Sequence, residues 1–479
     1  MSNDLYIAIS IVGGIYILGL IYCSYRGRKE LSEEKKTNSS AFMSIGSGIG
    51  PILGFLTFAA TLFSTFTLMG IPNFFRTHGV GTWIFLGVTD VAMGFVILWF
   101  GIKLHKKINT TEYTSVSKFL NQSYGGQIAG FVYMATIFIF LLPYVAIQIR
   151  GIGVFLEAVV PLGYSKDFWM IAIVFSMLIY SAIGGLKAII YSDAIQGVVL
   201  LVLTWIVASV CLSNSGGVLN LFEEVKISEE ALLSTPGPKG LFTVQFLIVS
   251  FITILLMPLS QPQLTNRIAY MRSTSDLKTM AIAVALFSLV VILPTIIIGF
   301  YGSVNYSELS AGDFIGKVLV KDQIAVIGAI SIVGLIAAAM STSDSILFAL
   351  GTELKESIFK KLNNSEFYVL LMIVAFSGLA YLLAKNEGIT DLVLLARLSF
   401  AGTALIAPMV ICAIYSDDDR SNLGWEVPIA SLFIVALFLL HVFGFGPNQL
   451  IGLRIDLALL IIVSIYVFSI YNLKIFLRK

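Results

Sequence analysis

Charged residues are scarce in this chain of 479 residues, where lysine, arginine, aspartate and glutamate together make up 12%. A soluble domain carries about 25% charged residues, so this sequence has too few to cover a globule of its length. Hydrophobic residues reach 57%, and the mean hydropathy is +0.93. Apolar runs repeatedly exceed the ~20 residues that cross a bilayer. The composition therefore excludes a soluble protein and indicates a polytopic membrane protein.

Cysteine and histidine are also rare, with three of each. Cys23, Cys211 and Cys412 lie in or at the edge of apolar runs, which excludes a disulfide framework or a cysteine metal cluster. The histidines show no ligand spacing, and a net charge of +2 gives no indication of a nucleic-acid partner. The first apolar run lacks a basic leading region and a small-residue cleavage site, so we expect a retained helix rather than a signal peptide.

Thirteen apolar segments are predicted to be helices, because an open strand cannot satisfy its backbone in lipid. The segments are 4–25, 50–71, 81–103, 126–158, 167–184, 188–212, 241–264, 278–303, 322–352, 367–384, 388–412, 426–445 and 453–474.

Loop charges predict the orientation, because loops rich in lysine and arginine stay in the cytoplasm. Basic loops and the basic C-terminus fall on one side, and an acidic stretch at 223–230 falls on the other. We therefore expect a protein of the plasma membrane. Its N-terminus would lie outside the cell and its C-terminus in the cytoplasm. The acidic loop 417–419 lies on the inner side, against the trend. The basic loops are 26–38, 103–107, 267–278 and 355–361.

An internal symmetry is plausible within a single transmembrane domain covering 1–479. The segments of 50–212 and of 241–412 form two sets of five that occupy similar lengths. Five is odd, so the second set must run inverted relative to the first. Inverted repeats of this kind occur in many secondary transporters. The helix at 4–25 and those at 426–474 would be peripheral, and we expect no soluble domain at either end.

The segment at 322–352 carries the strongest local pattern. Ala338, Ser341, Thr342 and Ser345 are spaced to share one helix face, so three hydroxyls lie beside a small residue. Small residues let another backbone approach closely. Neutral oxygens suit a hard cation, although such hydroxyls can also bond back to their own helix.

The segment at 50–71 repeats this pattern after a start rich in glycine and proline. Ala60, Phe63, Ser64 and Thr67 again share a face. A break here would free the carbonyls of Ala60 and Phe63, which lipid tolerates only against an ion, a cavity or protein. Ordinary packing through small residues is the alternative interpretation.

Two carboxylates fall inside predicted spans. Asp193 lies near the start of 188–212, and an ionisable residue in a span is a functional candidate by default. Asp344 lies away from the hydroxyl face, which favours a neighbouring hydrogen bond or a gate over direct ligation. Gln148, Arg150 and Arg397 could meet a solute, since a guanidinium prefers a planar anion. Arg150 could instead extend toward the interface.

Together these residues resemble the sodium/solute symporter family, which includes sodium-coupled sugar, proline, iodide, monocarboxylate, pantothenate and sialic acid carriers. The resemblance covers nearly the whole chain. The matching motifs are GGLKAIIYSDAIQ at 184–196, AAMSTSDS at 338–345, FAATLFS at 58–64 with MGIP at 69–72, PQL at 262–264 with Arg267, and SFAG at 399–402 with Pro408.

The resemblance implies an all-α LeuT-like fold with an inverted five-plus-five core, and sodium as the coupling ion. It implies a main sodium site formed by the carbonyls of Ala60, Phe63 and Ala338 and the hydroxyls of Ser341 and Thr342.

The resemblance also concerns a second ion and the solute. Some members hold a further sodium near positions matching Asp193 and Ser345, and positions matching Ser64 and Thr67 face solute. The first-helix motif is most similar to anion-carrying branches, which slightly favours a small organic anion such as a carboxylate or sialate.

The resulting prediction is a sodium-coupled symporter that imports a small organic solute by alternating access, with no obligate protein partner. The alternatives are a sugar or amino-acid symporter, or proton coupling through Asp193 and Asp344. A membrane enzyme would need a convergent nucleophile, base or metal cluster, and a channel would need a continuous polar stripe. We find neither pattern.

Overall fold

The computed structural model describes residues 3–35, 48–108, 113–160, 163–359, 365–386, 392–416 and 423–478. Some charges used to predict the orientation lie outside the described residues: Lys36, Lys360, Lys361 and the acidic loop 417–419.

Helices dominate the described chain. In chain order the elements are α1 (Asn3–Lys35), α2 (Pro51–Leu62), η1 (Phe66–Gly70), α3 (Ile71–His78), η2 (Trp83–Val88), α4 (Thr89–Ile108), α5 (Val116–Tyr124), α6 (Ile128–Phe140), α7 (Leu142–Val159), α8 (Lys166–Asn214), α9 (Val218–Glu229), η3 (Glu230–Leu233), α10 (Val244–Leu255), α11 (Met257–Ser260), α12 (Pro262–Ala269), α13 (Thr274–Asn305), α14 (Ala311–Gly316), η4 (Lys317–Lys321), α15 (Ala325–Leu354), η5 (Lys355–Phe359), α16 (Ser365–Lys385), α17 (Leu392–Ala404), α18 (Ala407–Tyr415), α19 (Glu426–Val442), β1 (Gln449–Leu450), β2 (Leu453–Arg454) and α20 (Ile455–Arg478).

Local sequence signals explain many helix starts. Hydroxyl side chains of Ser115, Ser165, Thr243 and Ser273 each accept a hydrogen bond from an amide in the first turn that follows. Such caps satisfy amide groups that have no partner within a helix. Pro51 opens α2, where a missing amide hydrogen has no cost. The elements are thus set by caps and prolines as well as by apolar length.

The thirteen predicted spans are not confirmed as a count. In the described part of the chain, nine helices are long and apolar enough to cross a membrane, or ten if the bent pair 51–62 and 66–78 is one span. The predicted span 241–264 is divided among α10, α11 and α12, and 426–445 corresponds to α19, which has only 17 residues.

Helix α8 joins two predicted spans, 167–184 and 188–212, without an interruption. A straight helix of its 49 residues would be about 73 Å long, more than twice a bilayer's hydrocarbon core. Its start packs at Met170 against Gly153 of α7, whereas Ala188 packs against Gly27 near the far end of α1. The second part of the helix runs back in the opposite direction, since Leu203 packs against Gly334, which lies in the first third of α15. The two predicted spans are therefore two arms of one helical run.

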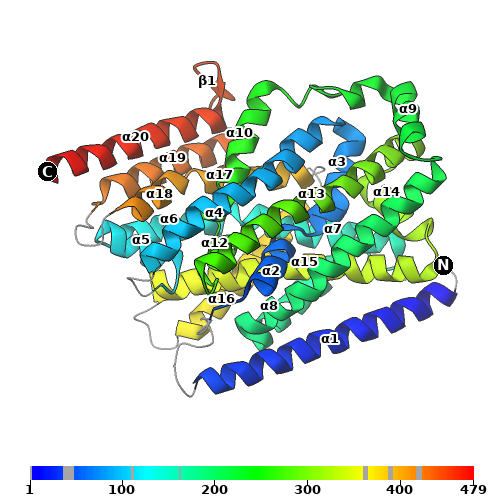
Figure 1. Ribbon diagram of the computed structural model, residues 1–479, viewed down its shortest axis with the longest axis horizontal. Helices are drawn as coiled ribbons and strands as arrows, with labels where there is room; N and C mark the ends of the chain where they lie inside the picture. The colour runs from blue at the N-terminus through cyan, green and yellow to red at the C-terminus, as the bar shows by residue number, and fades with distance from the viewer. Residues whose placement is uncertain are drawn as a thin grey trace.

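Figure 1 shows the N-terminus and α9 toward one end of the molecule, and α5 and the C-terminus toward the other. We call these the α9 end and the α5 end. Two interrupted helices, α2 with η1 and α10 with α12, open the two predicted repeats, and α2 packs against α12, α13, α8 and α15. The chain thus places a helix break from each repeat near its centre.

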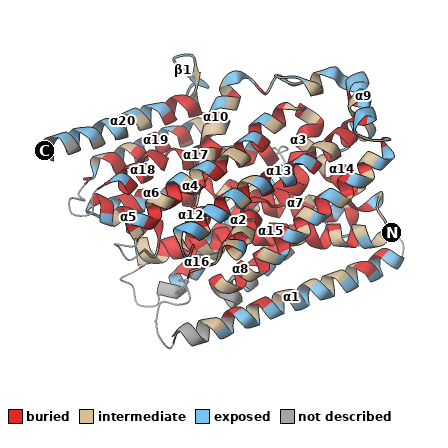
Figure 2. Cartoon of the chain, viewed as in Figure 1, coloured by how far each residue is buried: buried red, intermediate tan, exposed pale blue. Residues whose placement is uncertain are grey.

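Burial follows the bundle, with buried residues in the middle and exposed ones on α1, α9 and α20 (Figure 2). Helix α1 exposes Ile7, Ile11 and Leu18 by more than half, and only 6% of its span is buried. Such a surface is suited to contact with lipid rather than water.

A buried polar contact connects α15 to α5 at the α5 end. Glu353 of α15 is fully buried and accepts hydrogen bonds from the amides of Val116 and Ser117, at the start of α5.

Candidate functional site

The first core helix is broken at the place that the sequence suggests. Helix α2 ends at Leu62, Phe63 is extended with φ −96° and ψ 121°, and the chain resumes at Phe66, bent by 55°. Two hydroxyls cap the restart, because Ser64 N donates to Thr67 Oγ1 at 3.1 Å and Phe66 N donates to Ser64 Oγ at 3.2 Å. The last carbonyls of α2 thereby lose their usual amide partners.

Hydroxyls of α15 reach these carbonyls. Ser341 Oγ lies 3.1 Å from Ala60 O, and Thr342 Oγ1 lies 3.3 Å from Thr61 O and 3.5 Å from Ala60 O. Ala338, one turn earlier on α15, is buried in the same stretch. The structure thus brings the predicted hydroxyl face of α15 against the last carbonyls of α2, whereas the Ser64 and Thr67 hydroxyls bond within the restart of their own segment.

Asp193 lies against this junction and is completely buried. Its Oδ1 accepts from Ser341 Oγ at 2.6 Å, and its Oδ2 accepts from Thr57 Oγ1 at 2.6 Å. The Ser341 hydroxyl has one proton but two acceptors within reach, Ala60 O and the carboxylate. Acceptors therefore outnumber donors here, which suits a bound cation held by carbonyls of an unwound helix.

Arg267 of α12 supplies a fixed positive charge to the same cluster. Its Nη2 lies 3.2 Å from Asp193 Oδ2 and donates to Ser345 Oγ at 2.9 Å, while its Nε donates to Thr57 Oγ1 at 2.9 Å. Arg267 is 2% exposed. We call Thr57, Asp193, Arg267, Ser341 and Ser345 the ion-pair cluster. The sequence places Arg267 within a motif but gives no indication that it pairs with Asp193, although opposite charges inside spans commonly pair.

A small cavity lies beside the break, and residues of α4, α7, α10 and α17 contribute to its lining. It has about 10 Å³ of room for the centre of a water molecule, which corresponds to about one water. Among the described residues that line it, Asp90 is the one charged residue, and the sequence patterns did not single it out. None of these described lining residues is basic, so an anionic solute would have no opposite charge from them. The lining residues are Leu62, Phe63, Phe66, Thr67, Ile71, Leu86, Asp90, Tyr144, Ile254, Met257 and Phe400.

The four predicted solute residues fall in different places. Thr67 lines the cavity and Ser64 is buried at the break. Gln148 is fully buried on α7, and its Nε2 lies 3.4 Å from the carbonyl of Tyr144. Arg397 does not line the cavity.

Both candidate arginines hold helices together. The Arg397 guanidinium pairs with Asp456 of α20, donates to Ser250 Oγ at 2.9 Å, and lies over the Phe246 ring at 4.7 Å. Arg150 donates to the carbonyls of Ala384 and Asn386 at 2.7 Å each, at the end of α16. Cations at a helix C-terminus satisfy its last carbonyls. These contacts account for both charges without a solute.

Comparison with known proteins identifies the family of the chain. The family model described as "Sodium:solute symporter family" matches residues 42–422, most of the chain. The chain belongs to this family. It is therefore a membrane transporter that couples solute movement to sodium, and not an enzyme. A similar curated protein is sodium/proline symporter 2 of Staphylococcus saprophyticus, 25% identical over 428 residues that cover 84% of this chain and 80% of that protein.

Two solved structures are similar in fold. A sodium-coupled sialic acid symporter in a substrate-bound outward-open state has a TM-score of 0.74 at 16% identity, covering 98% of this chain and 97% of that one. A nucleobase-cation-symport-1 family transporter has a TM-score of 0.60 at 11% identity, covering 90% and 94%. The predicted LeuT-like class of this symporter is confirmed.

Proposed function

We propose that this symporter imports a small organic solute together with sodium by alternating access. The supporting observation is that Ser341 and Thr342 reach the carbonyls left open by the break in α2. A sodium ion at this junction would connect the broken helix of the first repeat to α15 of the second. Its ligands would be the carbonyls of Ala60, Phe63 and Ala338 and the hydroxyls of Ser341 and Thr342.

A further sodium near Asp193 and Ser345 requires a rearrangement. Arg267 Nη2 contacts both residues, and a second positive charge between them would be repelled. The guanidinium must therefore move away before an ion can bind there. In the arrangement described, one sodium site is compatible with the ion-pair cluster.

The orientation proposed is N-terminus outside and C-terminus in the cytoplasm of the plasma membrane. Lys103 and Lys106 belong to the end of α4, directly before α5 in the chain, whereas Glu223 and Glu224 belong to α9 at the opposite end of the molecule from α5. The excess of lysine and arginine on the cytoplasmic side is the physical basis. The N-terminus then shares the outer side with α9.

Coupling follows from where the ion and the solute would bind. Phe63 lies between the two, because its carbonyl is a proposed sodium ligand and its side chain lines the cavity. An ion that orders this segment raises solute affinity, and the solute raises sodium affinity by the same factor. The membrane potential adds ~2.3 kcal/mol per charge per 100 mV to inward transport. Loss of sodium toward the α5 end would release the solute.

Thermal unfolding of the purified chain in lipid nanodiscs, in sodium and in equimolar potassium, tests the sodium site. We expect sodium to raise the Tm, because a ligand that binds only the folded state stabilises it. Ser341→Ala or Thr342→Ala should increase the sodium concentration for the half-maximal shift at least tenfold, as expected for about 1.4 kcal/mol of lost ligation.

Ser331→Ala is the matched control, because Ser331 is a buried serine of α15 whose hydroxyl donates to its own helix, at Ile327 O. Its sodium response should equal that of the unmodified chain. A Tm that is the same in sodium and potassium, or a full sodium response in both Ser341→Ala and Thr342→Ala, would contradict the proposed site.

A further inference from the structure

Asp90 is a buried carboxylate that the fold leaves without a partner. It is the second residue of α4, directly after the π-helix η2, and π-helical turns frequently mark functional sites. It is 6% exposed and lies within the span Trp83–Ile108. Among the described residues, none donates a hydrogen bond to it or forms an ion pair with it. An isolated charge inside a span is costly, so Asp90 must either hold a proton or have a positively charged partner during function.

Other buried acids of the chain do have partners within the fold. Asp193 pairs with Arg267, and Asp456 pairs with Arg397. Glu353 accepts amide hydrogen bonds from the start of α5. The contrast indicates that the partner of Asp90 comes from outside the fold, and the cavity that Asp90 lines is the place where it would bind.

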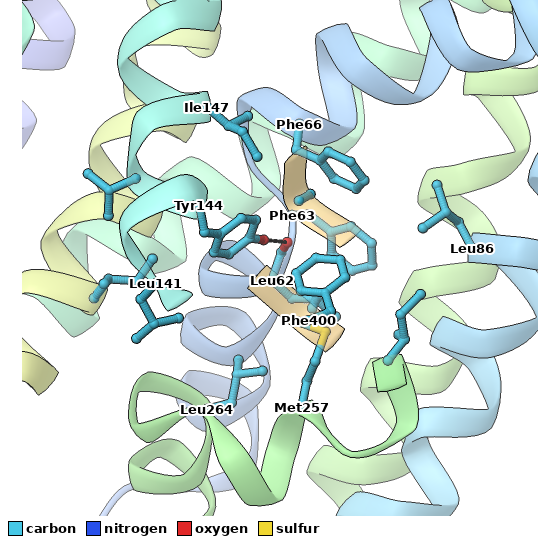
Figure 3. Close-up of a cluster of buried hydrophobic side chains, with 14 of the residues drawn as sticks. Leu62, Phe63, Phe66, Leu86, Leu141, Tyr144, Ile147, Met257, Leu264 and Phe400 are labelled. Atoms are coloured by element: carbon cyan, nitrogen blue, oxygen red, sulfur yellow. Dashed lines mark hydrogen bonds between the residues drawn. The ribbon is translucent and has the colours of Figure 1, made fainter. Parts of the chain in front are cut away.

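Aromatic rings form much of the wall around Asp90. Phe63, Phe66, Tyr144 and Phe400 all line the cavity, and Figure 3 shows their side chains gathered around one space. The rings of Phe66 and Phe400 are 6.5 Å apart and nearly perpendicular, and those of Tyr144 and Phe400 are 5.4 Å apart. Aromatic faces attract cations, and such rings recognise organic ammonium groups.

The remaining lining favours an organic cation over a bare metal ion. Besides Asp90, the described lining side chains offer two hydroxyls, those of Thr67 and Tyr144. Sodium requires several oxygens, whereas the alkyl groups of an ammonium compound are satisfied by apolar contact. The aliphatic lining consists of Leu62, Ile71, Leu86, Ile254 and Met257.

We propose that the transported solute carries a positively charged nitrogen, which binds against Asp90 and among the rings of Phe63, Phe66, Tyr144 and Phe400. This inference rests on the proposed symport function and names its solute class. It replaces the slight preference for an organic anion. The cavity admits about one water, so the walls must separate for the solute to enter, as in transporters that close over their ligand.

Two sources share this chemistry, a net cation and a zwitterion. Choline represents the first source, and proline and glycine betaine represent the second. Binding of choline would identify a net cation as the solute, and binding of proline or glycine betaine would identify a zwitterion.

The first experiment uses the unmodified chain in nanodiscs and measures binding by calorimetry in sodium. Choline and proline are each matched with a nitrogen-free analogue of similar shape, in which carbon replaces the charged nitrogen: 3,3-dimethylbutan-1-ol for choline and cyclopentanecarboxylate for proline. We expect one ammonium class to bind and its analogue to bind at least tenfold more weakly. Equal binding of a matched pair, or binding of lactate, sialic acid or glucose in place of the ammonium probes, would overturn the proposal.

The second experiment is Asp90→Asn, which retains the size and removes the charge. Ammonium binding should weaken at least about tenfold, since a hydrogen bond to a charged group is lost. Asp313→Asn, an exposed acid at the start of α14, should bind normally. Undiminished ammonium binding in Asp90→Asn would overturn the proposal. If Asp90→Asn does not fold, calorimetry of the matched probes with the unmodified chain tests the proposal by itself.

Sodium-induced stabilisation separates this proposal from the function on which it rests. Asp90→Asn should keep the sodium-dependent rise in Tm, because Asp90 is not one of the proposed sodium ligands. Loss of that rise would assign Asp90 to an ion and overturn the solute role. If the unmodified chain shows no sodium response at all, the proposed function fails independently of Asp90.

Discussion

Two acids inside the spanning helices have opposite surroundings. Asp193 is fully buried and contacts Thr57, Arg267 and Ser341, whereas Asp90 lines a mostly apolar cavity without a described partner. The ion-pair cluster therefore balances its own charge, and the cavity depends on a ligand for that balance. We conclude that loss of a fixed partner should reduce stability, whereas changes in the cavity should reduce affinity.

The largest effect should follow from Arg267→Ala. Asp193 would remain buried without a cation, and breaking a buried pair in this way costs about 3–5 kcal/mol of unfolding free energy. The measurement is a denaturant titration in potassium, so that sodium cannot replace the guanidinium. The double variant Arg267→Ala with Asp193→Asn should recover part of the loss. Unchanged stability of Arg267→Ala would show that the ion-pair cluster is not self-balanced.

Arg397→Ala should have a smaller effect on stability. It removes hydrogen bonds to a charged group, worth about 2–3 kcal/mol, but Arg454 stays 3.4 Å from Asp456 and limits the loss. Solute affinity should not change, because Arg397 lies outside the cavity. Calorimetry alongside the unfolding titration checks both. Normal stability with lost solute binding would instead place Arg397 at the solute, as the sequence suggested.

Phe400→Leu should show the smallest effect, and in affinity rather than stability. Removing one aromatic face should weaken ammonium binding roughly threefold to tenfold, in line with about 0.5–1.5 kcal/mol for a cation–π contact. Phe400→Tyr keeps the face and should bind normally. The sodium response of both variants should match the unmodified chain. Equal ammonium affinity in Phe400→Leu would remove the rings from solute recognition.

The sequence was most informative where residues close along the chain determine the outcome. Apolar length and the motifs predicted the membrane class and the fold, and the hydroxyl spacing of α15 predicted a face that does meet the open carbonyls of α2. The join between 184 and 188 was not predictable, because glycines and a lysine there are typical of a loop, yet α8 continues through it.

Pairings between distant segments could not be read from spacing. Asp456 lies 59 residues after Arg397, in a helix outside the predicted repeats, so nothing near Arg397 indicated that its charge was already satisfied. Asp90 was overlooked in the apolar run 81–103, although any lone acid in a span is a candidate. Its significance depends on the rings that other helices bring around it.

The contact of Glu353 with the start of α5 offers a practical consequence. Helix α15 carries Ser341 and Thr342 and, about three turns further along the same helix, Glu353, which accepts hydrogen bonds from the amides of Val116 and Ser117. A shift of α15 is therefore transmitted to α5. Gln122 of α5 is exposed, whereas all three native cysteines are buried. A fluorophore attached through Gln122→Cys would therefore report such a shift of α15 optically, from the opposite end of a hydrogen-bonded linkage.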